Sequence, residues 1–322
     1  MNLGRILETV RRRNLTPEET RRILRTVELE LQEALDEAFQ TSRRRLRVYR
    51  PHPDYPSISI TGGWCELDCR HCRRVYLKAM EWAERPELLE RRLRELADSG
   101  GIGCLVSGGY TKSGRLPVEP FLDALKKGSE MGLRMNMHPG LVDSETARRI
   151  ASSGVEAASM DAPGDPYTVR WVHGLDATPM DYARAMRNLS EAGVKVCPHV
   201  CVGLHGGRVR GELNAVRMVY GLGIRNLTFI ILIPTSGTDF QHVEPPRPTE
   251  VAALVALTRL LMPEADIGLG CMRPRGRYAA EVERLLLRAG VDRVVLPRRE
   301  TVEEARRLGI SVEWRSSCCV VE

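Results

Sequence analysis

The sequence predicts an α/β fold, a closed (β/α)8 barrel of the TIM type that follows an N-terminal helical extension. Three observations predict this fold. Beyond residue 50, short apolar runs alternate eight times with amphipathic stretches, the pattern of parallel strands joined by helices. The chain has 322 residues, 43% of them hydrophobic, which is enough to bury one large core. No stretch within residues 51–322 is long enough to act as a linker between two domains.

The helical extension, residues 1–50, comes first. Thr16-Pro17-Glu18-Glu19 is typical of a helix start, with a capping hydroxyl, a proline at the first helical position and a glutamate that can reach back to the cap. Apolar residues then recur at roughly helical spacing from Ile23 to Leu35. We expect the extension to cover the bottom of the barrel or to mediate dimerisation, and we assign it no chemistry.

The barrel, residues 51–322 with a cysteine-containing tail, is expected to hold eight strands and eight helices. The strand-like runs are residues 57–60, 102–106, 133–137, 155–160, 194–200, 226–232, 266–269 and 293–296. The helix-like stretches are residues 86–97, 118–131, 144–152, 179–192, 212–220, 249–261, 277–289 and 302–308. Eight such units favour a sheet that closes on itself.

The barrel predicts where chemistry should lie, because active sites of such barrels sit at the carboxyl ends of the strands. Polar and metal-binding residues do follow these ends. They are Cys65, Cys69 and Cys72 after the first strand, Ser107-Gly108-Gly109 after the second, Asn136 and His138 at the third, Asp161 at the fourth, Cys197, His199 and Cys201 along the fifth, and Cys271 after the seventh. A chance distribution would not gather them at one rim.

Cys65, Cys69 and Cys72 form a C-x3-C-x2-C pattern directly after the first strand. Three thiolates this close can hold three corners of a cubane iron–sulfur cluster and leave the fourth iron free for a small molecule. A structural zinc ion usually takes four protein ligands in two separated pairs, and the sequence has no second C-x2-C. The pattern therefore predicts a 4Fe-4S cluster, and a non-catalytic zinc-binding module is the alternative of a different class.

This cysteine motif resembles that of the radical S-adenosylmethionine (SAM) superfamily, in which the unique iron chelates the cofactor. His71 falls where that family usually has an aromatic residue, and Ser107-Gly108-Gly109 resembles its GGE motif without the acidic third position. The resemblance implies that Asp161 binds the ribose hydroxyls, although Asp161 as a helix N-cap is the competing interpretation. It also implies a set of cofactor-binding residues: His71, Ser107, Gly108, Gly109, Asn136, Asp161 and Cys201.

The remaining cysteines predict a second cluster. A cysteine pair at the C-terminus, Cys318 and Cys319, would be exposed and oxidisable unless ligation inside the barrel mouth protected it. Together with Cys271 it is expected to hold an auxiliary iron–sulfur cluster. The alternative pair is Cys104 and Cys197, which fall at positions where biotin synthase keeps ligands of its two-iron cluster. That alternative site would be incomplete, because its third position is Asn136.

From about residue 55 onward, the chain resembles the biotin-synthase-like group and, within it, the two-component archaeal-type lipoyl synthase proteins. The shared features are GCLVSGG, LGCMRPRG and the terminal cysteine pair. The resemblance implies sulfur insertion into the octanoyl chain of a lipoyl carrier protein, with the auxiliary cluster as sulfur donor. It also implies two further partners, a second radical SAM protein and an electron donor such as ferredoxin. A biotin-synthase-like or other cofactor-biosynthetic radical SAM enzyme is the alternative.

Composition excludes other classes of protein. No apolar run reaches membrane-spanning length and no signal peptide is apparent, so we expect a cytoplasmic protein without membrane partners. Nine bunched cysteines favour metal ligation in a reducing compartment over a disulfide framework. The net charge of +6 is dispersed and only 5% of residues are aromatic, which argues against nucleic-acid binding. The positive net charge is at least as consistent with binding of an acidic protein partner.

Overall fold

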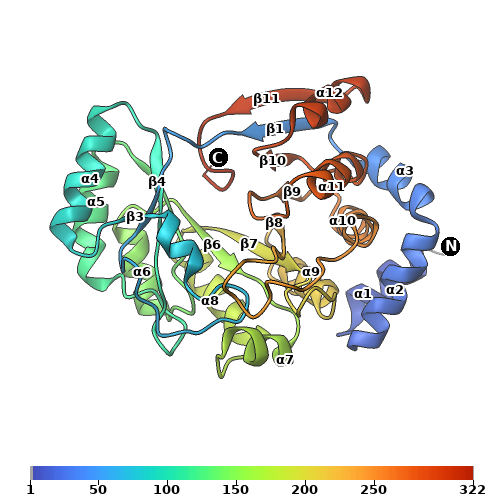
Figure 1. Ribbon diagram of the computed structural model, residues 1–322, viewed down its shortest axis with the longest axis horizontal. Helices are drawn as coiled ribbons and strands as arrows, with labels where there is room; N and C mark the ends of the chain where they lie inside the picture. The colour runs from blue at the N-terminus through green and yellow to red at the C-terminus, as the bar shows by residue number, and fades with distance from the viewer. Residues whose placement is uncertain (1–2, 322) are drawn as a thin grey trace.

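The computed structural model describes residues 3–321 and shows a parallel sheet curled into a partial barrel, with helices outside (Figure 1). The sheet has eleven strands in the order β11-β1-β10-β9-β8-β7-β6-β5-β4-β2-β3. The strands are β1 (Arg45–Tyr49), β2 (Ser57–Ser59), β3 (Glu81–Trp82), β4 (Gly103–Ser107), β5 (Arg134–Met137), β6 (Ala157–Asp161), β7 (Lys195–Val202), β8 (Asn226–Ile231), β9 (Asp266–Leu269), β10 (Arg293–Val295) and β11 (Ser311–Arg315).

The helices are α1 (Leu3–Arg12), α2 (Pro17–Leu29), α3 (Leu31–Thr41), α4 (Pro86–Asp98), α5 (Leu122–Glu130), α6 (Ser144–Ser152), α7 (Pro166–Thr168), α8 (Pro179–Glu191), α9 (Glu212–Gly221), α10 (Pro248–Leu261), α11 (Arg277–Arg288) and α12 (Arg299–Arg307). Three short helical turns, η1 (Val75–Ala79), η2 (Glu119–Phe121) and η3 (Val169–His173), complete them, and η3 has π-helical hydrogen bonding.

The predicted fold class, an α/β barrel with N-terminal helices, is confirmed. All eight predicted strands are present as β2 and β4 to β10, and the eight predicted helices correspond to α4, α5, α6 and α8 to α12. The strands β1, β3 and β11 are additional. β1 begins at Arg45, within the segment assigned to the helical extension.

One detail of the fold differs from the prediction, since the described strands do not close into a ring. β1 pairs with β10 and β11 instead of with β2, so β11 and β3 are the two edges of the sheet. The chain after β1 crosses the gap, where the N–H groups of Ile102 and Leu105 donate to the carbonyls of Asp54 and Pro56, each at 2.9 Å. β1 therefore occupies the edge of β10 that a closed barrel would pair with β2, and β11 covers the other edge of β1, so the sheet stays open.

The C-terminal tail, residues 316–321, lies inside this partial barrel. Cys319, Val320 and Val321 are buried in one cluster with residues of the surrounding strands and of the crossing segment, namely Tyr49, Tyr55, Ala157, Cys197 and Val295. Figure 1 marks the C-terminus within the ring of strands, between β4 and β10. Side-chain packing by the tail thus fills the interior beside the open seam.

The N-terminal helices pack on the outer helix layer and not across the barrel bottom, so that part of the expectation is wrong. α2 and α3 contact α10, and α1 contacts α9 and α10 (Figure 1). The predicted cap is present, because the Thr16 hydroxyl accepts from the Glu19 N–H at 3.2 Å and the Glu19 carboxylate accepts from the Thr16 N–H at 2.9 Å. α10 is apolar on all sides because it lies between this extension and the sheet.

Among the helices of residues 3–321, none is both long and apolar enough to cross a membrane.

Candidate functional site

Cys65, Cys69 and Cys72 lie on one loop at the carboxyl end of β2. All three line one cavity, together with Gly108, Gly109, Asp161 and His173. The loop leaves Cys72 through Arg73 and Arg74, which have φ values of 43° and 63°. Residues other than glycine rarely adopt this left-handed conformation, and they do so mostly where the surroundings enforce it. The cysteines therefore sit on a specifically shaped loop and not on a relaxed connection.

Two neighbouring segments fix the loop. On one side, the Glu66 N–H donates to the Tyr110 carbonyl at 2.8 Å, just beyond β4. On the other, the Arg70 N–H donates to the Val172 carbonyl in η3 at 2.9 Å, and the Arg70 guanidinium pairs with Asp239 at 2.9 Å. The cysteine loop is thus held between the second strand of the predicted barrel and the π-helical turn after β6.

The thiols differ in their surroundings. Burial, and then the nearby Cys72 and Cys65, raises the pKa of the Cys69 thiol, and burial also raises the pKa of Cys72. Cys65 accepts from the Tyr110 N–H at 3.2 Å, and Cys72 accepts from the Arg74 N–H at 3.3 Å. Backbone N–H groups aimed at sulfur stabilise a thiolate that ligates iron.

These residues fit an iron–sulfur cluster better than a single metal ion. Within residues 3–321, no three His, Cys, Asp or Glu side chains converge as ligands of one ion would. A zinc site requires such convergence, whereas a cubane cluster keeps its three protein ligands apart. His71 Nδ1 is buried in the wall of the same cavity and, within the described residues, has no hydrogen-bond partner. Such an unsatisfied polar atom suits a cavity that takes a polar ligand.

Gly109 allows the strand end to approach the cysteine loop. A side chain at this position would place its Cβ 1.7 Å from the Trp64 carbonyl oxygen and 2.6 Å from Cys65. The Gly109 N–H donates to Thr61 Oγ1 at 2.6 Å, which ties the two segments together. Gly108 also lines the cavity, while Ser107 lies beside His138 with Oγ 3.4 Å from Nδ1. Glycine is therefore required here for packing, and contact with a cofactor amine stays a prediction.

Asp161 ends β6 and lines both the cysteine cavity and a second, adjoining cavity. It is not the helix cap that competed with the ribose-binding role. The cap of α7 is Asp165, whose carboxylate accepts from the Thr168 N–H at 2.7 Å and from Arg210 at 2.7 Å. No hydrogen bond to the Asp161 carboxylate occurs within residues 3–321, which leaves this acceptor directed at the cavities.

The second cavity contains residues that the sequence analysis missed. Beside the predicted Cys201, it is lined by Asp165, His205, Arg210 and Glu212. The Glu212 carboxylate is buried, and burial raises its pKa to about 7 although the N–H groups of Gly203, Arg210 and Gly211 donate to it. The glycine-rich run that follows β7, with Gly203, Gly206, Gly207 and Gly211, was the available signal for a ligand-binding turn.

A family model described as the radical SAM superfamily matches residues 59–210, which span the cysteine loop, Asp161 and all of the second cavity except Gly211 and Glu212. These residues, a little under half of the chain, are similar to a radical SAM domain. The site therefore belongs to a radical SAM enzyme, with a 4Fe-4S cluster and SAM as its cofactors, and the zinc-module alternative is wrong.

Curated relatives are biotin synthases of low identity. The chain is 24% identical over 320 residues to biotin synthase of Halorhodospira halophila, covering 91% of this chain and 93% of that protein. It is 22% identical over 321 residues to biotin synthase of Prochlorococcus marinus, covering 88% of this chain and 92% of that protein. The similarity thus extends well beyond the radical SAM domain.

Solved structures support the fold alone at their low identities. Methylornithine synthase is 15% identical and covers 98% of both chains, with a TM-score of 0.63. The FeFe-hydrogenase maturase HydG from Carboxydothermus hydrogenoformans is 14% identical and covers 99% of this chain and 80% of that chain, with a TM-score of 0.65.

Beyond the radical SAM domain, the structure brings the tail cysteines near other thiols in the barrel interior. A hydrogen bond from Cys319 lowers the pKa of Cys318, while burial and the nearby Cys271 and Cys197 oppose this shift. Cys271 follows β9 at the exposed rim. Cys318 and Cys319 thus lie next to each other in the interior, with Cys271 near enough to influence their pKa values, and whether the three bind a cluster stays a prediction.

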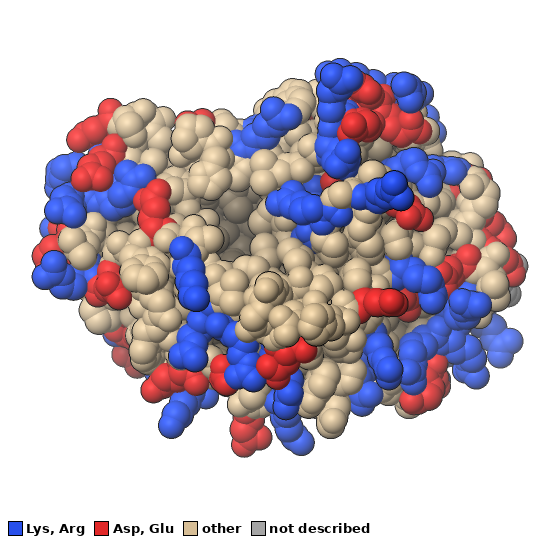
Figure 2. Space-filling view, in the orientation of Figure 1, with Lys and Arg blue, Asp and Glu red and all other residues tan. Residues whose placement is uncertain are grey.

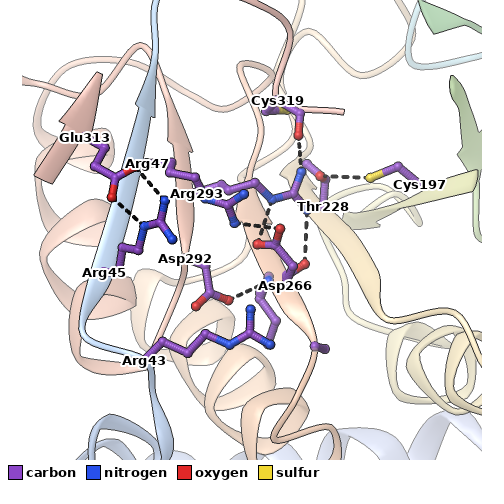
Figure 3. Close-up of polar contacts among 12 residues, drawn as sticks. Arg43, Arg45, Arg47, Cys197, Thr228, Asp266, Asp292, Arg293, Glu313 and Cys319 are labelled. Carbon is purple, nitrogen blue, oxygen red and sulfur yellow. Dashed lines mark hydrogen bonds and ion pairs between the residues drawn. The ribbon is translucent and has the colours of Figure 1, made fainter. Parts of the chain in front are cut away.

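A buried arginine anchors the tail (Figure 3). The Arg293 guanidinium donates to the backbone carbonyl of Cys319, to Asp266 at 3.0 Å and to the Leu227 carbonyl at 3.2 Å. Burial alone would lower the pKa of Arg293, but Cys197 and Asp266 raise it above its usual value. A positive charge therefore lies beside the tail thiols at every pH at which the protein is folded.

The alternative cysteine pair is not assembled. Cys104 and Cys197 are both buried, but Cys104 packs in the core between the sheet and the outer helices, whereas Cys197 faces the barrel interior with the tail. Asn136, predicted to contact a cofactor, lies away from the cysteine cavity. Its Nδ2 donates to Ser159 Oγ at 2.9 Å and approaches Cys318 Sγ at 3.7 Å. Side-chain direction on β4 therefore excludes a shared site for Cys104 and Cys197.

Proposed function

We propose that this radical SAM enzyme inserts sulfur at an unactivated carbon, as the biotin synthases do. One observation carries the proposal: the barrel holds two separate groups of thiols with a polar path between them. Ser159 lines the cavity of Cys65, Cys69 and Cys72, and Asn136 joins Ser159 to Cys318. A substrate in the barrel interior would then lie between the cofactor site and a sulfur source.

When bound, the cluster and SAM would supply a carbon radical able to remove hydrogen from a C–H bond that no acidic or basic side chain can activate. The protein's own residues would bind the cofactor and orient the substrate. Asp161 would accept hydrogen bonds from the ribose hydroxyls, and the cavity lined by Glu212 would enclose the adjoining part of the cofactor. The buried tail and the surrounding strands exclude water, which would otherwise quench a reactive substrate carbon.

Cys271, Cys318 and Cys319 are the proposed ligands of an auxiliary iron–sulfur cluster that donates the sulfur. Adjacent cysteines cannot easily bind one ion together, but they can reach two different irons of one cluster. The hydrogen bond between the two thiols lowers the pKa of Cys318 and raises that of Cys319, so binding of iron by both sulfurs would have to displace the proton that Cys319 holds. Arg293 would balance the negative charge of a thiolate-bound cluster from inside the barrel.

A second candidate function is one half of a two-protein lipoyl synthase, acting on an octanoylated lipoyl carrier protein. The observation that favours it is the buried tail pair, combined with the separation of Cys104 from Cys197. A thiol set built from Cys271 and the C-terminus differs from the set that biotin synthase uses. This candidate requires a second radical SAM protein and an electron donor such as ferredoxin.

The test compares two substrates on anaerobically reconstituted protein with SAM and a chemical reductant. One is the sulfur-free precursor of biotin, and the other is an octanoylated carrier protein. Mass spectrometry of the products should show sulfur added to one of them and formation of 5′-deoxyadenosine. If 5′-deoxyadenosine forms while neither substrate gains sulfur, the sulfur-insertion proposal is wrong and only the radical chemistry remains.

A further inference from the structure

An exposed patch of arginines and apolar side chains lies at the rim beside the tail thiols. It comprises Arg50, Arg275, Leu296, Arg298, Trp314 and Arg315, called here the rim patch. These residues end or follow β1, β9, β10 and β11, which are neighbours in the sheet order β11-β1-β10-β9. Three strand spacings separate the outer two strands, a width of about 14 Å.

The rim patch has an excess of positive charge. Within the described residues, no carboxylate pairs with Arg50 or Arg275. Arg298 pairs with Glu300 at 3.4 Å and Arg315 with Glu313 at 2.8 Å. Figure 2 shows Lys and Arg above and to the right of a hollow near the centre of the molecular face, close to where Figure 1 marks the C-terminus. An anionic surface would be attracted to this side of the barrel mouth.

The rim patch is also rigid. Arg273 is fully buried and donates to the Gly270 carbonyl at 2.5 Å, the Leu296 carbonyl at 3.1 Å and Glu283 at 2.7 Å. Glu283 in turn accepts from the Arg298 N–H at 2.9 Å. This buried ion pair therefore ties the loop after β9 to the loop after β10, so the patch is ordered before any partner arrives.

Leu296 and Trp314 give the patch its apolar part. Leu296 is 36% exposed, with φ of 49°, a conformation that leucine rarely adopts. Trp314 is 44% exposed, and the Arg50 guanidinium lies over its ring at 4.6 Å from the centroid. Exposed tryptophan and arginine beside an aliphatic side chain are typical of the centre of a protein–protein interface.

We propose that the rim patch binds the acidic face of a protein that carries the substrate on one of its side chains. This inference rests on the second candidate function, sulfur insertion into a substrate that a carrier protein holds. Arg50 and Arg275 follow β1 and β9, two strand spacings or about 10 Å apart, which exceeds what one small carboxylate can bridge. An acidic protein surface can reach both and can also compete with Glu300 and Glu313 for Arg298 and Arg315. A single-stranded nucleic acid would need stacking rings, and Arg50 already covers Trp314, the aromatic residue of the patch. A protein seated here would present a side chain to Cys271 and the barrel mouth.

The test reverses charge on the patch and measures binding as well as turnover. The variant is Arg50→Glu/Arg275→Glu/Arg298→Glu, and its matched control is Arg22→Glu/Arg148→Glu/Arg187→Glu, three exposed arginines outside the patch with the same change in charge. The binding probe is a fluorescently labelled octanoylated carrier protein. We expect its affinity to fall about tenfold or more in the variant only, and wild-type binding to weaken with added salt.

Turnover on two substrates separates docking from chemistry. The variant should show a raised KM for the octanoylated carrier but unchanged kinetics on a short neutral peptide that contains octanoyl-lysine. Equal affinity of variant and wild type for the carrier overturns the proposal. An equal loss of turnover on carrier and peptide also overturns it, as does tighter binding of wild type to an RNA oligonucleotide than to the carrier. If wild type sulfurates neither substrate, the second candidate function fails, while the binding measurement still decides the role of the patch.

Discussion

The loop after β2 and the C-terminal tail both gather cysteines, but they are built differently. The loop places Cys65, Cys69 and Cys72 within one short segment, so its ligand set exists in the sequence itself. The tail pair reaches Cys271 only after the barrel has formed around residues 316–321. Ligands within one short segment can bind a metal cluster with little contribution from the rest of the fold. Ligands from segments far apart in the chain can bind one only after the fold has brought them together.

The two regions also differ in their electrostatics. The loop cysteines face a cavity that also contains the Asp161 carboxylate and the His71 imidazole, whose Nδ1 has no hydrogen-bond partner among residues 3–321. The tail cysteines face a guanidinium, Arg293, that is already fully engaged. The first region is suited to receive a cofactor from solution, and the second to hold a group in place.

The largest expected effect is the loss of the loop cluster. Cys69→Ala should abolish reductive cleavage of SAM, because two thiolates anchor the cluster poorly and no neighbouring side chain replaces the third. The measurement is 5′-deoxyadenosine formed per enzyme under anaerobic, reducing conditions. Undiminished product in this variant would remove the basis for the assignment of the loop as the cofactor site.

The next effect should separate the two regions. Cys318→Ala/Cys319→Ala should halve the iron and sulfide content and stop sulfur transfer, while uncoupled cleavage of SAM continues. Point substitutions test this better than truncation, since Val320 and Val321 belong to the buried core. Each loss of a buried sulfur should cost about 1 kcal/mol of stability, which the fold should tolerate. Full iron content in the double variant would mean that the tail binds no cluster.

Sequence predicted most of the fold because its signals are local. The eight strands and helices, the Thr16 cap and the cysteine loop all follow from patterns within a few residues. The open seam of the sheet did not follow, because β1 pairs with β10 and β11, two strands far away in the chain. The burial of the tail has the same long-range origin.

The sequence predicted the residues of the site only where the prediction did not depend on the direction in which a side chain points. Asp161 and Asp165 are four residues apart, and the sequence does not distinguish the helix cap from the free carboxylate. Cys104 and Cys197 were paired by position, but alternation along β4 turns Cys104 to the other face of the sheet. Glu212 was missed because a buried carboxylate at a helix start resembles ordinary capping in the sequence.

A smaller effect sharpens the contrast between the two aspartates. Asp161→Ala should weaken SAM binding by about 1.5–3 kcal/mol, the range for a hydrogen bond to a charged group, with fold and iron content unchanged. Asp165→Ala is the matched control, and it should instead lower the melting temperature, since it removes the α7 cap and the partner of Arg210. Calorimetric titration and thermal unfolding together check both. Equal affinity in wild type and Asp161→Ala would exclude the ribose-binding role.

The smallest expected effect is a pH dependence of folding stability, which should arise from Glu212 in the second cavity and not from the tail. Burial raises the pKa of Glu212 from 4.5 to about 7, so the folded state favours the protonated carboxyl. Its contribution to stability is complete below pH 4.5 and is lost as pH rises towards 7. Buried His71 and His199, whose pKa values burial lowers to about 3, act in the opposite direction as pH falls below 6.5.

The comparison of wild type with Glu212→Gln therefore isolates the carboxyl. The difference in unfolding free energy between them should change by on the order of 1–3 kcal/mol from about pH 4.5 to 7.5, with wild type losing stability relative to the variant as pH rises. Urea unfolding at several pH values provides the measurement. A parallel pH dependence of wild type and Glu212→Gln would show that Glu212 is ionised throughout, held by the three backbone N–H groups that donate to it.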